Sequence, residues 1–229
     1  MKTIGLIGGM SWESTVTYYQ IINERIKERL GGLHSAKILL YSVDFAEIER
    51  CQAAGEWDKS AEILTGAAKS LEAGGADFIV ICTNTMHKVL PQIEREVHVP
   101  FLHIADATAD ELIRNNIKKA ALLGTKYTMT QDFYKSRLIE RGIDVVVPNE
   151  REAEAVNRVI YEELCLGIIS EKSRAEYSEI IARLKNEEGA EAVVLGCTEI
   201  GLLIGSEDSV LPVFDTTLIH ASAAALKSL

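Results

Sequence analysis

The chain has 229 residues, of which 47% are hydrophobic and 25% are charged, and its net charge at pH 7 is −10. This composition is ordinary for a globular protein, and the acidic balance argues against a nucleic-acid partner, which needs a basic face. No apolar run approaches the roughly 20 residues that span a bilayer, so no membrane partner is expected either.

The first residues, "MKTIGLIGGMSWES", are glycine-rich and lack a cleavage site, which is typical of a buried strand rather than a signal peptide. The four cysteines form no CxxC pair, so neither a disulfide framework nor a zinc site is indicated; they are Cys51, Cys82, Cys165 and Cys197. We therefore expect a cytoplasmic protein without a metal centre.

Short apolar runs alternate with longer helical patterns along the chain. The predicted strands cover residues 3–8, 37–44, 77–82, 100–105, 119–124, 144–148, 191–196 and 211–215. The predicted helices cover residues 14–30, 58–73, 88–96, 106–115, 130–141, 150–165, 173–187 and 216–228. Continuous apolar strands separated by helices favour parallel sheets covered on both faces.

This pattern occurs twice. "TIGLIGG" matches "AALLGT", "SLEAGGADFIVICTNT" matches "RLKNEEGAEAVVLGCTE", and "VPFLHIAD" matches "LPVFDTTL", at offsets of 116, 114 and 112 residues. Such near-constant offsets predict an α/β fold of two pseudo-symmetric three-layer α/β/α lobes with mostly parallel sheets. The first lobe would span 1–115, with residues from about 208 to 229 packing back on it, and the second 116–207. Ligands bind beyond the carboxyl ends of such strands, so we expect the active site in the cleft between the lobes.

Cys197 ends an apolar strand where we expect the backbone to turn toward a helix. A thiol at the positive end of a helix is stabilised as the thiolate, which lowers its pKa. The plain alternative is a small buried hydrophobe, as most isolated cysteines are. Under the 114-residue offset, the position equivalent to Cys197 is Thr83.

Thr83 is followed by Asn84 and Thr85, and this run of hydroxyl and amide groups at a helix start suits a carboxylate ligand. Thr198 offers the same chemistry from the second half, and Thr125 lies at the turn that corresponds to Gly8 and Gly9. Simple helix capping is the alternative for these residues.

Three other residues with reactive side chains are assigned structural roles. Cys82 alternates with Thr83 along the strand and should point into the sheet packing. His87 and His103 have no companion at metal-ligand spacing, so capping or packing is the favoured interpretation for both.

Four segments in order resemble the aspartate/glutamate racemase family, specifically its bacterial L-aspartate/glutamate-specific or broad-specificity branch. They are "IGLIGGMSWEST", "CTNTMHK", "PFLHIADAT" and "GCTEI", and they span nearly the whole chain. The resemblance implies a homodimer without cofactor, independent of pyridoxal phosphate. It also implies two cysteines that flank the α-carbon of a bound amino acid and exchange its proton from opposite faces.

The second cysteine of the family corresponds to Cys197, whereas Thr83 takes the place of the first. Because a hydroxyl is a far weaker acid than a thiol, we predict that Cys197 removes the proton and that Thr83 serves the reprotonating face. Met10 would supply a backbone N–H to the substrate. Many relatives have a lysine where "EELCLG" has Cys165, so Gln52 and Arg50, in the loop after the second strand, are candidates for binding the side-chain carboxylate.

Two other functions stay open. A decarboxylase or isomerase of the same superfamily would use a single thiol on a small carboxylic acid. An amino-acid-binding protein without turnover would need neither group as an acid or base. We expect a small-molecule amino-acid substrate in the leading case, with aspartate or glutamate first.

Overall fold

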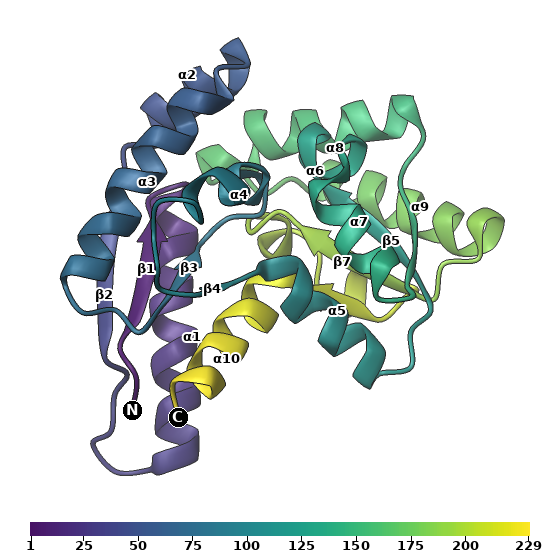
Figure 1. Ribbon diagram of the computed structural model, residues 1–229. Helices are drawn as coiled ribbons and strands as arrows, with labels where there is room; N and C mark the ends of the chain where they lie inside the picture. The colour runs from purple at the N-terminus through teal and green to yellow at the C-terminus, as the bar shows by residue number, and fades with distance from the viewer. The chain divides into compact units, whose positions relative to one another are not determined.

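The computed structural model describes residues 1–229, which form two compact units. The first unit comprises Met1–Ile104 and Thr217–Leu229, and the second comprises Ala105–Thr216 (Figure 1). From the sequence we predicted the boundaries between residues 115 and 116 and between about 207 and 208. The difference arises because the helix after residue 104 and the last strand both belong to the second unit.

The first unit is a four-stranded parallel sheet in the order β2-β1-β3-β4. Its strands are β1 (Ile4–Gly8), β2 (Ile38–Ser42), β3 (Phe78–Ile81) and β4 (Phe101–Leu102). Its helices are α1 (Trp12–Leu30), α2 (Phe45–Ala54), α3 (Trp57–Ala73), the 3₁₀ helix η1 (Thr85–Val89), α4 (Leu90–Ile93) and α10 (Thr216–Ser228).

Both faces of this sheet are buried, as continuous apolar strands require. Alternate residues of β1 and β3 pack on opposite faces. Leu6 and Val80 contact the α1 and α10 side, whereas Ile7 and Ile81 contact the α2 and α3 side. The unit is therefore three layers, and the helices on its two sides are seen in Figure 1.

The second unit repeats this plan, with a parallel sheet in the order β6-β5-β7-β8. Its strands are β5 (Lys119–Gly124), β6 (Asp144–Val146), β7 (Ala192–Gly196) and β8 (Val213–Asp215). Its α-helices are α5 (Ile104–Arg114), α6 (Lys126–Thr130), α7 (Asp132–Glu140), α8 (Glu150–Glu162) and α9 (Glu171–Glu188). Its 3₁₀ helices are η2 (Leu164–Leu166), η3 (Ile200–Leu202) and η4 (Ser206–Asp208).

Helix α5 is tied to the second unit by polar contacts with α7. Tyr134 donates a hydrogen bond of 3.1 Å to Thr108, and Arg137 pairs with Asp106 at 2.8 Å. These contacts explain why the unit boundary lies before α5 rather than after it. The opposite face of the sheet packs against α8 and α9.

The identical strand order confirms the predicted fold class of two related α/β lobes. All eight predicted strands are present, and β1, β3 and β4 correspond to β5, β7 and β8 as the sequence matches required. Helix α2 was not predicted, because residues 45–54 looked like a polar loop. Asp44 caps it by accepting from the backbone N–H of Ala46, and Gly55 ends it in a left-handed conformation.

The turn after β1 requires glycine. Gly9 has φ of +91°, and a Cβ there would lie 2.2 Å from the carbonyl oxygen of Val43. A side chain at Gly8 would lie 2.3 Å from Thr15. With glycine there, the Thr15 hydroxyl accepts a hydrogen bond of 2.8 Å from the backbone N–H of Gly9. Close packing of backbone and helix therefore sets the course of the chain from β1 into α1.

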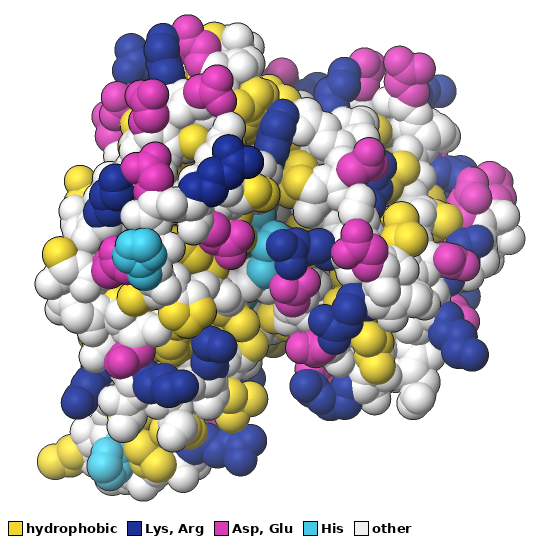
Figure 2. All heavy atoms as spheres, in the orientation of Figure 1, with side chains coloured by type: hydrophobic (Ala, Val, Ile, Leu, Met, Phe, Trp, Pro, Cys, Tyr) yellow, Lys and Arg dark blue, Asp and Glu magenta, His cyan; other side chains and the backbone are white.

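No helix of the structure combines the length and hydropathy needed to traverse a bilayer. On the face seen in Figure 2, Lys and Arg side chains are interspersed with Asp and Glu. Many of the ion pairs are short-range pairs on exposed helix faces, such as Arg25 with Glu28 and Lys59 with Glu56. Exposed pairs of this kind contribute little to stability.

Candidate functional site

The predicted site residues fall into two groups, one in each unit. The first group is Met10, Gln52, Thr83, Asn84 and Thr85, and the second is Thr125, Cys197 and Thr198. Most follow a strand directly, at the carboxyl edge of their own sheet, where ligands of open α/β sheets bind.

Thr83 lies just past β3, where sheet pairing ends. The N–H of Cys82 still donates to the carbonyl of Ile7 at 2.9 Å, whereas the N–H of Thr83 turns back to Ile81. The Thr83 side chain is half-buried. Cys82 is fully buried in the core on the α1 and α10 side, where burial raises the pKa of its thiol. The prediction that Cys82 is a packing residue is therefore confirmed.

Asn84 and Thr85 are both buried at the start of η1. The single helix predicted over 88–96 is instead a 3₁₀ turn followed by the four-residue α4, with Pro91 in its first turn. Such short elements have no appreciable helix dipole. Any anion held here would depend on the side chains and local N–H groups, not on a helix end.

His87 anchors the backbone of Thr83. Its Nδ1 donates to the Thr83 carbonyl at 2.8 Å, because that oxygen can only accept, and its Nε2 accepts from the N–H of Ile104 at 3.3 Å. The His103 ring lies beside it at a tilt of 53°, with 4.4 Å between ring centroids. Both histidines are buried, which agrees with the predicted capping or packing role.

A third buried histidine extends this cluster from α10. His220 Nε2 donates to the Leu102 carbonyl at 2.9 Å, and its Nδ1 accepts from the Tyr18 hydroxyl at 2.9 Å. Burial lowers the pKa of His220 to about 4. Sequence reasoning missed this residue, because its partners come from β4 and α1, far away along the chain.

Met10 and Gln52 occupy different kinds of position. Met10 is buried in the turn between β1 and α1, with its side chain in the core of the first unit. Gln52 is buried on α2, and its Nε2 donates to the sulfur of Met86 at 3.0 Å, which brings it against η1. The expectation that Gln52 and Arg50 lie in a loop was wrong, because Asp44 and Gly55 bound a helix there.

In the second unit, Thr125 and Cys197 each follow a glycine of neighbouring strands. Gly124 of β5 pairs with Gly196 of β7, and a Cβ at Gly124 would lie 2.9 Å from the Gly196 carbonyl. The two glycines therefore let the strand ends approach closely. Thr125 lies at the turn after β5 and caps α6 by accepting from the N–H of Thr128. Helix capping was the alternative role considered for this residue.

The surroundings of Cys197 differ from those expected. Cys197 is 9% exposed, and its thiol donates to Oε2 of Glu199 at 3.0 Å. Burial, followed by the charge of Glu199, raises the pKa of Cys197 well above that of a free thiol. The expected stabilisation of the thiolate by a helix was wrong, because η3 after Cys197 has only three residues.

Glu199 is the residue that sequence reasoning quoted but did not assign. It is 6% exposed, and the same Oε2 that accepts from Cys197 also accepts from the Thr198 hydroxyl at 2.7 Å. An acidic residue two positions after the candidate cysteine in "GCTEI" is the signal that could have drawn attention to it, because a carboxylate that becomes buried needs donors such as these.

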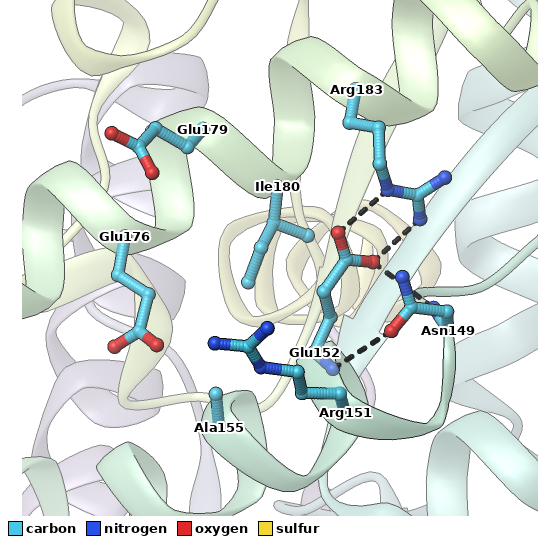
Figure 3. Close-up of a pocket in the computed structure, with 8 residues that line it drawn as sticks. All are labelled: Asn149, Arg151, Glu152, Ala155, Glu176, Glu179, Ile180 and Arg183. Carbon is cyan, nitrogen blue, oxygen red and sulfur yellow. Dashed lines mark hydrogen bonds and ion pairs between the residues drawn. The ribbon is translucent and has the colours of Figure 1, made fainter.

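A separate hollow lies on the surface of the second unit, between α8 and α9 (Figure 3). It has a volume of about 390 Å³ and is lined mainly by charged side chains: Arg151, Glu152, Glu176, Glu179 and Arg183. Glu152 pairs with Arg183 and also closes the capping box at the start of α8. None of the candidate residues lines it. No group of three or more His, Cys, Asp or Glu side chains is placed to hold a metal ion.

The model of the Asp/Glu/Hydantoin racemase family matches residues 7–224. This chain belongs to that family. The match confirms the family resemblance noted in the sequence, and it supports an isomerase that acts on amino acids.

Several relatives of this racemase family member match nearly the whole length of the chain. The broad specificity amino-acid racemase RacX of Bacillus subtilis (strain 168) is 26% identical over 96% of this chain and 95% of its own. The structure of an aspartate racemase homologue from Pyrococcus horikoshii OT3 is 40% identical, with a TM-score of 0.87 over 100% and 99% of the two chains. A Yersinia pestis protein, provisionally assigned as an Asp/Glu racemase, is 57% identical with a TM-score of 0.93 over 100% and 99%.

The buried His220 makes the stability of this racemase family member depend on pH. Between pH 6.5 and about 4 the unfolded chain binds a proton on this histidine that the folded chain does not. The free energy of unfolding should therefore fall as the pH drops through this window, by about 3 kcal/mol from this group. Urea unfolding at a series of pH values measures it.

The matched control for this prediction is His220→Gln, which keeps a donor to the Leu102 carbonyl but cannot titrate. Any weakening of the hydrogen bond with Tyr18 changes stability equally at every pH, so only the slope is diagnostic. Equal slopes for the two proteins between pH 6.5 and about 4 would contradict the prediction.

Proposed function

We propose that this chain is a cofactor-independent amino-acid racemase that interconverts L- and D-aspartate or L- and D-glutamate. Thr83 and Cys197 are the two acid–base groups, acting on opposite faces of one bound α-carbon. The observation that carries the proposal is their equivalence. Each follows the corresponding strand of two sheets with the same topology, β3 in one and β7 in the other.

The chemistry needs two groups because inversion exchanges a proton on opposite faces of carbon. The Cys197 thiolate takes the α-proton, and the electron pair of the C–H bond moves into the α-carboxylate. A proton from the Thr83 hydroxyl then forms the new C–H bond on the other face. Solvent returns a proton to the Thr83 oxygen, and the proton taken up at Cys197 is released to solvent, so both groups return to their starting states. General acid–base catalysis by positioned groups of this kind contributes about 10²–10⁴-fold.

The proposed substrate-binding residues supply hydrogen bonds rather than a cofactor. Asn84, Thr85 and Thr198 offer amide and hydroxyl groups to the carboxylates, and Met10 offers its backbone N–H. Thr125 and Gln52 complete the set. The aspartate/glutamate preference is supported by the Pyrococcus horikoshii relative, described as an aspartate racemase homologue, whereas RacX is described as having broad specificity.

The proposal also includes a homodimer in the cytoplasm. A chain of 25.2 kDa should then elute at twice this mass, which light scattering measures directly.

Incubation with each amino acid in heavy water tests the function. The racemase should replace the α-proton of aspartate or glutamate by deuterium, seen by NMR, while chiral chromatography shows both enantiomers approaching equal amounts. Release of carbon dioxide would instead indicate a decarboxylase. Binding by calorimetry without any exchange would indicate a binding protein, and either result would overturn the proposal.

A further inference from the structure

We propose that Glu199 is the proton acceptor that converts the Cys197 thiol into the thiolate, so that the two side chains share one proton through the reaction. This inference rests on the proposed racemase function for its place in turnover. Its first consequence, the reactivity of the Cys197 sulfur, is measurable without turnover.

The contacts place two donors on one carboxylate oxygen. Oε2 of Glu199 accepts from Sγ of Cys197 at 3.0 Å and from the Thr198 hydroxyl at 2.7 Å. All three residues lie in the turn after β7, and Cys197 and Glu199 are both buried. A carboxylate this close to a thiol, with a hydroxyl that fixes its orientation, has the geometry of a base for that thiol.

The charge of the pair explains why a base is needed. Ionising the thiol by loss of its proton to water would place a thiolate and a carboxylate about 3 Å apart in a buried site, which is strongly unfavourable. The short η3 provides no helix dipole to offset this repulsion. Transfer of the proton within the pair keeps a single negative charge, so this repulsion is avoided.

The step is balanced within the pair. The S–H bond of Cys197 breaks, its electron pair stays on sulfur, and the proton forms an O–H bond on Oε2 of Glu199. The thiolate then takes the α-proton of the substrate and becomes the thiol again. Glu199 releases its proton to solvent as the Thr83 oxygen regains one, so the pair again holds a single proton at the end of each turnover.

A competing interpretation gives Glu199 only a structural role in the turn. In that case its charge would simply oppose ionisation of Cys197. The two interpretations predict opposite effects of removing the charge. Without it, a thiol under simple repulsion would react faster, whereas a thiol that depends on an internal base would react more slowly.

Alkylation of Cys197 by iodoacetamide distinguishes the two, with the modified cysteine identified by peptide mass spectrometry. In the unmodified protein an internal base should make the rate nearly independent of pH around neutrality. In Glu199→Gln, which keeps the shape and an acceptor oxygen, the rate should fall about 10²-fold at neutral pH and rise tenfold per pH unit. Glu207→Gln, at an exposed glutamate of η4, is the matched control and should behave like the parent.

The kinetics of racemisation provide a second, independent measurement. The kcat of Glu199→Gln should fall by a similar factor and acquire the same rise with pH, while KM changes little. Glu199→Asp, which keeps the charge but shortens the side chain, should retain a flat pH profile at reduced rate. Circular dichroism spectra matching the parent's establish that each variant is folded.

The proposal is overturned if Glu199→Gln alkylates as fast as or faster than the parent, or if the parent itself shows a tenfold rise per pH unit. The pH dependence of the parent is measured without any variant, so the proposal can be tested even if Glu199→Gln does not fold. If the parent exchanges no α-proton in heavy water, the racemase function fails, whereas the alkylation profile still decides the role of Glu199 at Cys197.

Discussion

Cys197→Ala is expected to lower kcat/KM by about 10²–10⁴-fold in both directions of racemisation. The reason is that one face of the α-carbon loses its only proton-transferring group. Because two enantiomers are equally stable, the equilibrium constant is one, and kcat/KM must fall by the same factor from either side. Coupled assays or chiral chromatography from pure L- and pure D-substrate measure both directions.

Cys82→Ala is the matched control for this experiment, because Cys82 is the other thiol next to the candidate site. Its side chain is buried in the core, so the variant should lose about 1 kcal/mol of stability and retain its activity. Loss of activity in Cys82→Ala, together with an active Cys197→Ala, would reverse the assignment of the catalytic thiol.

Thr83→Cys is expected to raise kcat about tenfold or more for the enantiomer whose α-proton faces residue 83. A thiol ionises far more readily than a hydroxyl, so a cysteine serves as a base where threonine serves mainly as a proton donor. Any change in kcat/KM must be equal in both directions, and the final mixture must stay at equal amounts. Initial rates at saturating L- and D-substrate separate kcat from KM.

Thr83→Ser and Thr83→Ala complete this series. The serine variant keeps the hydroxyl and should retain most activity, whereas the alanine variant should lose about 10²-fold or more. An alanine variant as active as the parent, or unchanged rates in Thr83→Cys while Cys197→Ser remains active, would remove Thr83 from the mechanism.

The fold was largely predictable because the strands are buried on both faces. Runs such as "DFIVIC" and "AVVLG" consist of apolar residues without helical spacing, and strands of this kind have few other stable environments. The duplicated order of strands and turns then indicated two sheets of the same topology. Helix α2 was missed because its apolar stripe is short, with Ile48 and Cys51 buried in an otherwise polar segment, and because the capping signals of Asp44 and Gly55 were not used.

The places of Thr83 and Cys197 after corresponding strands were predictable, whereas the surroundings of Cys197 were not. The equivalence of Thr83 and Cys197 follows from their place after matching strands. The ionisation of Cys197, however, depends on the depth of burial and on the orientation of Glu199 in a three-residue turn. Neither is encoded in spacing along the chain, which indicated a helix where the structure has a 3₁₀ turn.

By itself, the sequence determined the alternation of strands and helices, the duplication, the family and the residues that follow each strand. These are properties of short segments, and local hydrophobic patterning is enough to specify them. Tertiary structure alone decided that α5 belongs to the second unit, that His87, His103 and His220 form one buried cluster, and that the Cys197 thiol donates a hydrogen bond to Glu199. Each of these depends on which groups packing brings together away from water, where charges and hydrogen bonds have their largest effects.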